Sequence, residues 1–291
     1  MRPWREIACR PVAGWSSPVS LCGNGRGGRR LLRVLTRCPL RIALMGTRGI
    51  PVKYGGFETF YENLGPRLAE RGHDVFVYVR PHMTEQPHLR RYRDTRLVPL
   101  PSIRHKHLET LSHTLLSTLH GLRKRYDVVL ICGVGNAPVA WIPRLSGATV
   151  ALNVDSADWN RTKWGRFARM YLRSSARVAT HAMNVVVADN GAIQRHYRED
   201  LGAHVRFIAY GAEPIAEPGD DVLRELGAER RGYILWVGRL EPETKVDQLT
   251  RDALRAAAYE RAQQFYTWEH IVDQYERLFQ EMVRACAGRN A

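Results

Sequence analysis

The sequence of 291 residues has few cysteines, few acidic residues and no long hydrophobic run, and each shortage excludes a class of protein. Its five cysteines are scattered and include no Cys-x-x-Cys pair, which argues against a disulfide framework and against a zinc site. The most apolar stretch, residues 128–142, is interrupted by glycine, asparagine and proline, and falls short of the roughly 20 apolar residues that span a bilayer. We therefore expect a cytoplasmic protein of a reducing compartment.

Several catalytic motifs are absent as well. The sequence contains neither His-Glu-x-x-His nor Gly-x-Ser-x-Gly, so zinc-hydrolase and serine-hydrolase chemistry have no support. It also lacks an Asp-x-Asp metal motif, and we expect neither a metal nor a cofactor. The histidines in and beside a leucine-rich segment supply no such motif; they are His105, His107, His113 and His120.

The shortage of acidic residues gives the chain a net charge of +15, from 44 Lys and Arg against 29 Asp and Glu. Residues 1–40 contribute +7 of this charge and show no periodicity, so we interpret them as a disordered basic leader. Gly23–Gly28 match the Gly-x-Gly-x-x-Gly pattern, but no strand precedes them and no helix follows, which argues against a dinucleotide site. Binding of nucleic acid through this leader stays open as an alternative function, although no nucleic-acid-binding module is recognisable and our main hypothesis excludes such a partner.

From residue 41 onward, short apolar strands alternate with amphipathic helices, which predicts right-handed βαβ units on a Rossmann-type parallel sheet. We expect an α/β N-terminal domain over residues 41–215. Residues 216–291 contain a single further strand pattern, 233–237, followed by helix, which is too little for a second complete domain. The predicted strands are 41–46, 74–79, 127–132, 148–153, 184–188 and 205–209, and the predicted helices include 57–71, 108–122 and 162–181.

A glycine-rich segment follows the first strand and leads into a helix. Gly55 and Gly56 stand where that helix begins, and glycine lets the backbone approach a ligand closely because it has no Cβ atom. The free N–H groups and the dipole of a helix N-terminus favour a phosphate. The segment therefore predicts a phosphate site, although a tight turn that merely needs glycine is the alternative.

The same segment resembles the opening of family 4 glycosyltransferases, in particular the bacterial rhamnosyltransferase-like enzymes of polysaccharide assembly. Further matches follow in the same order, with Ser156 and Asp158 as departures from the family pattern. The resemblance implies a GT-B-like fold, in which residues 41–215 form the acceptor domain and residues 216–291 the remainder of a donor domain. The matching segments are Gly46–Pro51, Tyr54–Thr59, Arg67–His73, Asn153–Gly165, Val187–Asp189 and Ile208–Glu213.

This resemblance also implies the partners and the roles of individual residues. The donor is a nucleotide-diphosphate sugar, and the acceptor is a glycan or a lipid-linked sugar. Arg239 and Lys245 would hold the diphosphate together with Gly55 and Gly56, since two cations can neutralise the leaving group without a metal. Asp155 would lie at the reacting sugar as the catalytic residue. The residues assigned to the acceptor cleft are Tyr54, Glu58, Asn153 and Trp159.

One part of the family pattern is missing. The family has two glutamates eight positions apart that contact the sugar and the ribose, and no such pair follows Lys245. The family's C-terminal ending nevertheless resembles Tyr266–Phe279, and in the family it packs back on the first domain. We interpret the sequence as carrying an internal deletion joined near residues 248–252, and expect little or no transferase activity. A non-catalytic remnant that binds acceptor lipid or a partner protein is the alternative.

The predicted helix over residues 162–181 carries arginines three or four positions apart. Such residues share one face of a helix, and a basic amphipathic helix suits the surface of an anionic membrane. We therefore expect peripheral binding to the inner face of the plasma membrane, with a solvated basic face as the alternative. These arginines are Arg166, Arg169, Arg173 and Arg177.

Overall fold

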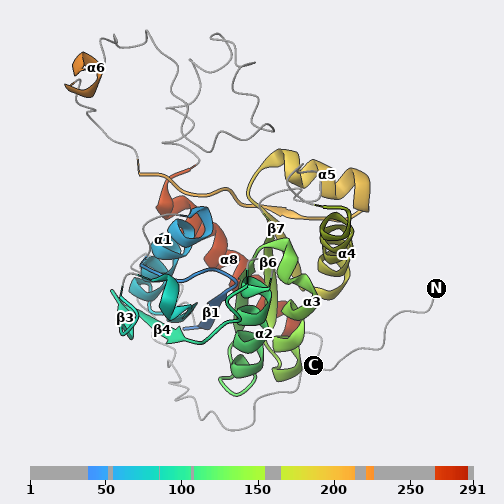
Figure 1. The fold of residues 1–291 in the computed structure, drawn as a ribbon, viewed down its shortest axis with the longest axis horizontal. Helices are drawn as coiled ribbons and strands as arrows, with labels where there is room; N and C mark the ends of the chain where they lie inside the picture. Colours follow the sequence, from blue (N-terminus) through green and yellow to red (C-terminus); the bar gives the residue numbers. More distant parts are fainter. Residues whose placement is uncertain are drawn as a thin grey trace, which may run out of the picture.

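The computed structural model describes residues 39–51, 55–84, 86–105, 108–154, 165–213, 221–225 and 266–287 (Figure 1). Within this part of the chain, one sheet has the strand order β3-β4-β2-β1-β5-β6-β7-β8, and every pair is parallel except β3 with β4. The strands are β1 (Arg41–Met45), β2 (Asp74–Val79), β3 (Arg91–Tyr92), β4 (Thr95–Pro99), β5 (Val128–Cys132), β6 (Thr149–Val154), β7 (Val185–Ala188) and β8 (Arg206–Phe207).

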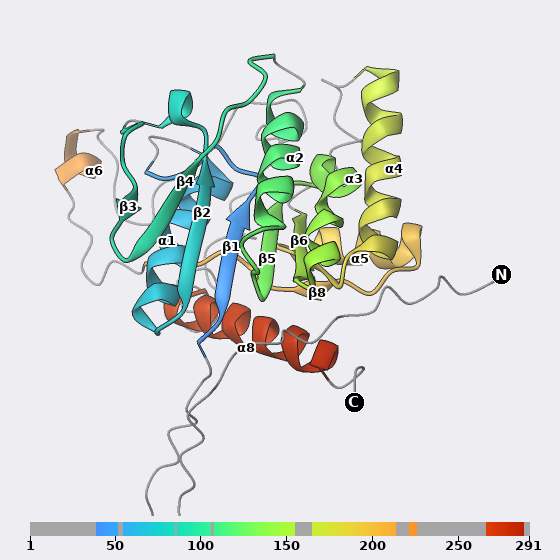
Figure 2. The same cartoon turned by 90° about the horizontal axis from the view of Figure 1, so that it is seen from below.

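Helices cover both faces of the sheet (Figure 2). One apolar core lies between the sheet and α1 and α8, and the other lies on the face that carries α3 and α4. The helices are α1 (Gly56–Glu70), α2 (Glu109–Gly121), α3 (Ala137–Ala140), α4 (Arg166–Ala182), α5 (Gly191–Leu201), α6 (Asp221–Glu225) and α8 (Trp268–Ala287), with short 3-10 turns η1 (Pro81–Met83), η2 (Val134–Asn136) and η3 (Ile142–Ser146).

The central strands are short runs of valine, isoleucine, leucine and alanine that are almost wholly buried. Since helices shield both faces, these strands need no alternation of polar and apolar residues. The predicted α/β class with a Rossmann-type parallel sheet is confirmed. The structure adds two strands that the sequence pattern does not predict, β4, which pairs in parallel with β2, and the short antiparallel edge strand β3. Neither is a continuous buried apolar run.

The order of the parallel strands decides where a ligand can bind. From β1 the chain moves outward to β2 and β4, and then returns to the other side of β1 to add β5, β6 and β7. The strand order therefore reverses between β1 and β5. In open α/β sheets, ligands bind outside the carboxyl ends of the strands at such a reversal.

Helix α8 comes from the far end of the sequence and completes the core beneath α1 (Figure 1). Tyr275 and Phe279 are fully buried, and Trp268 stacks with Phe60 of α1 at a ring-centroid distance of 6.4 Å. This C-terminal segment thus packs on the first domain, as the family resemblance implies.

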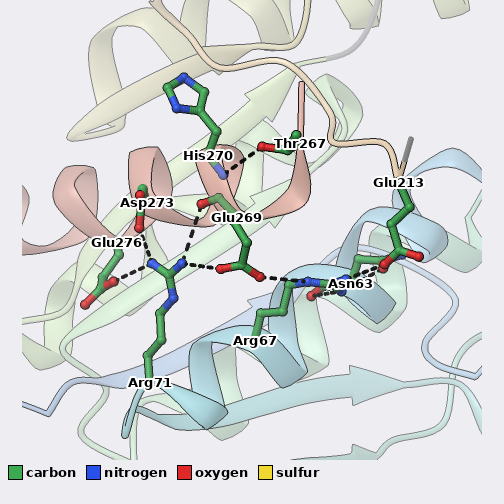
Figure 3. Close-up of polar contacts among 9 residues, drawn as sticks. All are labelled: Asn63, Arg67, Arg71, Glu213, Thr267, Glu269, His270, Asp273 and Glu276. Carbon is green, nitrogen blue, oxygen red and sulfur yellow. Dashed lines mark hydrogen bonds and ion pairs between the residues drawn. The ribbon is translucent and has the colours of Figure 1, made fainter. Parts of the chain in front are cut away.

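Polar contacts also join α1 to α8 (Figure 3). The guanidinium of Arg71 contacts Asp273, Glu269 at 2.8 Å and Glu276 at 3.0 Å. His73 lies 3.2 Å from the other oxygen of Glu276, and both side chains are almost completely buried. These contacts satisfy charges that would otherwise be costly to bury, and they fix the register of α8 on the sheet.

Helix α2 forms where the leucine pattern predicts it, but its leucine side is exposed and its opposite side packs on the sheet. The residues that it buries are small or polar, and its most exposed large side chains are leucines. The apolar stripe that locates this helix in the sequence is therefore not the side that packs on the sheet.

Several predicted features lie outside the described residues. They are most of the leader over residues 1–40, the strand pattern at 233–237 and the junction near residues 248–252. Among the helices that the structure describes, none is both long and apolar enough to cross a membrane.

Candidate functional site

The loop after β1 lies against the ends of the neighbouring strands, and two glycines make this possible. Gly46 has φ +91°, and a Cβ atom there would stand 2.6 Å from the carbonyl oxygen of Cys132 at the end of β5. Gly49 has φ +117°, and its Cβ atom would meet the side chain of Val79 at 2.5 Å. Both positions therefore need glycine, and the loop crosses the strand reversal as a tightly fitted turn.

The two glycines at the start of α1 differ in what surrounds them. Gly55 has φ +143°, and a Cβ atom there would stand 1.9 Å from Oε2 of Glu58. Glu58 is buried, and its Oε1 accepts a hydrogen bond of 3.0 Å from the amide N–H of Arg48. Gly56, in contrast, has no atom within 4 Å of its Cβ position. The carboxylate thus explains Gly55, whereas the space beside Gly56 is available to a ligand at the helix N-terminus.

A buried arginine lies beside this loop and was not among the residues predicted from the sequence. Arg80 follows β2 directly, is 3% exposed, and donates its amide N–H to the carbonyl of Arg48 at 2.8 Å. Its Nε has no hydrogen-bond partner among the described residues, and Nη1 lies 3.9 Å from Glu109. Burial lowers the pKa of Arg80, and the carboxylates of Glu109 and Glu58 partly offset this. An arginine directly after a strand was the available sequence signal.

His113 of α2 packs against the same strand end. It is fully buried, and its Nε2 lies 3.2 Å from the carbonyl oxygen of Val79. Burial and the nearby charge of Arg80 lower the pKa of His113 to about 4. The imidazole is therefore neutral near pH 7 and donates its one proton to that carbonyl. Its position off the leucine stripe was the signal in the sequence.

Asn153 is a further buried polar residue at the carboxyl edge of the sheet. It lies near the end of β6, is fully buried, and donates its amide to the hydroxyl of Tyr275 at 3.0 Å. Its Oδ1 has no hydrogen-bond partner within the described ranges. Asn153 therefore ties the carboxyl edge of the sheet to α8.

The structure brings some of the predicted site residues together and separates others. Gly55, Gly56 and Glu58 lie together at the start of α1, while Asn153 lies further along the same edge of the sheet, on β6. The four predicted arginines of α4 are all exposed and lie on a different element. The predicted residues that lie outside the described ranges are Tyr54, Asp155, Trp159, Arg239 and Lys245.

This arrangement is suited to an anion. The uncovered start of α1 offers backbone N–H groups and a helix dipole, and the positive charge of Arg48 is close enough to lower the pKa of Arg80. Among the described residues, no cluster of three or more His, Cys, Asp or Glu side chains could hold a metal ion.

Comparisons with known proteins bear on the same residues. The family described as "Glycosyl transferase 4-like domain" matches residues 55–211, which is more than half of the chain. No curated protein matches.

Similar solved structures include the following two. Sucrose-phosphate synthase from Thermosynechococcus elongatus is 14% identical with a TM-score of 0.42, and the match covers 64% of this chain and 95% of that one. HepE from Anabaena, solved in complex with UDP and glucose, is 14% identical with a TM-score of 0.46, and the match covers 65% of this chain and 50% of that one. The chain therefore spans about half the length of HepE.

Proposed function

The chain belongs to the glycosyl transferase 4-like family, and on that premise we propose that it binds a nucleotide-diphosphate sugar for transfer of a hexosyl or rhamnosyl residue to a glycan or lipid-linked acceptor. The observation that carries this proposal is the uncovered start of α1 beside the strand reversal, inside the matched range. A phosphate bound there would accept hydrogen bonds from backbone N–H groups.

The proposed roles follow from charge. The transfer leaves a nucleoside diphosphate, whose developing negative charge has to be neutralised. Gly55 and Gly56 would face this diphosphate, and Arg239 and Lys245 would hold it. Asp155 would lie at the reacting sugar.

The acceptor is proposed to bind at Tyr54, Glu58, Asn153 and Trp159. An acceptor carried on a lipid would require the chain to work at a membrane, and the exposed arginines of α4 suit the inner face of the plasma membrane. This is the basis on which we propose a peripheral location.

We propose further that turnover is low, because the pair of glutamates expected after Lys245 is absent from the sequence. Such a chain would bind the donor weakly or act as a non-catalytic remnant that binds acceptor lipid or a partner protein.

Calorimetric titration with UDP, GDP and dTDP tests the donor site. We expect one of them to bind, and Arg239→Ala and Lys245→Ala to weaken that binding by at least about tenfold, since each cation contacts a doubly charged group. Arg198→Ala is the matched control, because Arg198 is exposed on α5 away from the loop. Absence of any diphosphate binding, with binding of extracted lipid acceptors retained, would favour the remnant.

Incubation with radiolabelled nucleotide sugars and extracted lipid acceptors tests turnover. We expect little product. A kcat in the ordinary range of enzymes, about 1 to 1,000 per second, would contradict the inferred deletion.

A further inference from the structure

Helix α2 exposes its apolar side. Leu115 is 39% exposed and Leu119 is 47% exposed, and Leu108 precedes them on the same face at positions i, i+7 and i+11. A helix on the surface of a globular protein usually buries such a stripe. Here the stripe faces away from the sheet.

The opposite side of α2 explains why. Gly121 lies against Met45 of β1, where a Cβ atom would be 3.2 Å from the methionine Cε, so the helix can approach the sheet closely. The buried hydroxyls of Thr114 and Ser117 donate to carbonyls of the preceding turn at 2.8 and 2.7 Å. Since these hydroxyls are hydrogen-bonded within the helix, burying them costs little free energy. The leucines therefore lie on the exposed side of the helix.

The neighbouring elements of the same layer also expose large apolar side chains. Helices α2, α3 and α4 lie side by side over one face of the sheet (Figure 2), and η3 packs beside α2. Trp141 and Leu145 at η3 are 39% and 54% exposed, and Phe167 and Met170 on α4 are 85% and 63% exposed. We call these four residues, together with Leu115 and Leu119, the outer face of the α2–α4 layer.

The charges around this outer face are mostly positive. In the described residues 109–154 and 165–182 the only carboxylates are Glu109 and Asp127. Glu109, the first residue of α2, contacts His82 and lies 3.9 Å from Arg80, and Asp127 accepts a hydrogen bond of 2.7 Å from the amide N–H of Arg41 at the start of β1. The arginines of α4 are exposed beside Phe167 and Met170. Leucine and aromatic side chains flanked by arginine match a bilayer that has an apolar interior and anionic headgroups.

We infer that the outer face of the α2–α4 layer docks on an anionic lipid bilayer, with its leucine and aromatic side chains entering the acyl boundary. This deepens the proposed function and rests on it, since a lipid-linked acceptor would be reached from this position. It differs from adsorption by the arginines alone, because apolar insertion survives high salt whereas electrostatic adsorption is screened.

Flotation of the full chain with vesicles of phosphatidylcholine, with and without phosphatidylglycerol, tests the inference. We expect binding to the anionic vesicles. Leu115→Gln/Leu119→Gln should weaken it by about tenfold or more, because the transfer of two leucines to an apolar phase is lost. Arg173→Gln/Arg177→Gln should weaken it by roughly 25-fold on anionic vesicles. Phe207→Thr is the matched control, because Phe207 is 40% exposed on β8 and should leave binding unchanged.

The depth to which the outer face enters the bilayer is measured with lipids that carry bromine on the acyl chain. They should quench the fluorescence of Trp141, and the loss of that signal in Trp141→Phe assigns it. Each variant substitutes exposed residues only, and circular dichroism melting checks that it folds.

Failure of the full chain to bind, or equal binding by Leu115→Gln/Leu119→Gln, would overturn the inference. So would sedimentation showing a dimer that the same variant converts to a monomer without any change in vesicle binding, because the outer face would then be a contact between copies. Nucleoside diphosphate binding in the absence of vesicles tests the donor site separately, so a failure of one proposal can be told from a failure of the other.

Discussion

At the scale of single residues, the adjacent glycines at the start of α1 should behave differently. Gly55→Ala should lower the free energy of unfolding by about 3 kcal/mol, because φ +143° is strained for alanine and its Cβ atom would meet Glu58. Gly56→Ala should change stability by less than about 1 kcal/mol, or stabilise, since alanine favours a helix. Urea unfolding of the two variants measures this difference.

The same pair separates folding from ligand binding. If a diphosphate approaches the backbone beside Gly56, then Gly56→Ala should weaken nucleotide binding while leaving stability intact. Equal destabilisation by the two substitutions would show that the space beside Gly56 is closed in solution.

The buried imidazole of His113 should make stability depend on pH. Its pKa is about 4 in the folded protein against 6.5 ordinarily, so between these values the unfolded chain binds a proton that the folded protein does not. Stability is thus complete above pH 6.5 and falls as the pH falls toward 4. Between pH 7.5 and 5 the loss from this one group is about 2 kcal/mol.

His113→Gln keeps a donor for the carbonyl of Val79 and removes the titration. Urea unfolding at pH 7.5 and pH 5 should therefore show a smaller loss for the variant than for the wild type. An identical loss would mean that His113 is protonated in the native state at pH 5.

At the scale of elements, the attachment of α8 depends on one buried carboxylate. Glu276 is 1% exposed and contacts Arg71 at 3.0 Å and His73 at 3.2 Å. The His73 Nδ1 accepts the amide N–H of Leu40, so in the neutral ring the proton is on Nε2 and points to Glu276. Glu276→Gln should destabilise by about 2 kcal/mol, because it removes a buried carboxylate that accepts hydrogen bonds from two donors, while Arg71 keeps Asp273 and Glu269.

Glu281 on the same helix supplies the comparison. It is exposed and lies 3.5 Å from the exposed Arg206. Glu281→Gln should change the free energy of unfolding by less than about 1 kcal/mol, since water and salt screen such a pair. Chemical denaturation of the two variants should rank them in this order; the reverse ranking would refute the role given to Glu276.

At the scale of the whole molecule, α8 belongs to the core of the sheet domain although 60 residues of sequence, 208–267, separate it from β8. Its fully buried Ile271, Tyr275 and Phe279 alone account for about 6 kcal/mol of burial, which is comparable with the stability of an ordinary domain. A chain ending at residue 265 should therefore fail to unfold cooperatively and should bind a hydrophobic dye. A chain ending at Ala287 is the control and should melt like the full chain. Cooperative melting of the shorter chain would show that the sheet domain is complete without α8.

The central strands were predictable because each is a short apolar run between polar turns, as in Asp74–Val79, which matches β2 residue for residue. The glycines of the loop after β1 were equally visible in the sequence. The strands β3 and β4 at one edge of the sheet were not predicted, since they lack such a run. Arg80 and His113 left only weak signals, a position directly after a strand and a position off the leucine stripe. Their significance comes from burial at the end of β2, and burial depends on residues distant in the sequence. Which side of α2 is exposed could not be predicted from the sequence for the same reason.

The sequence by itself therefore determined the α/β class, the order of its elements and the glycine-rich start of α1, because periodicity and turn chemistry are local properties. Only the tertiary structure decided which glycine is fixed by a neighbouring carboxylate, which helix completes the core and which side of α2 meets the surroundings. These outcomes depend on close packing between segments far apart in the chain. A hydroxyl that is hydrogen-bonded within its own helix can be buried as readily as a leucine. The local sequence therefore does not determine whether the hydroxyl side or the leucine side of α2 packs on the sheet.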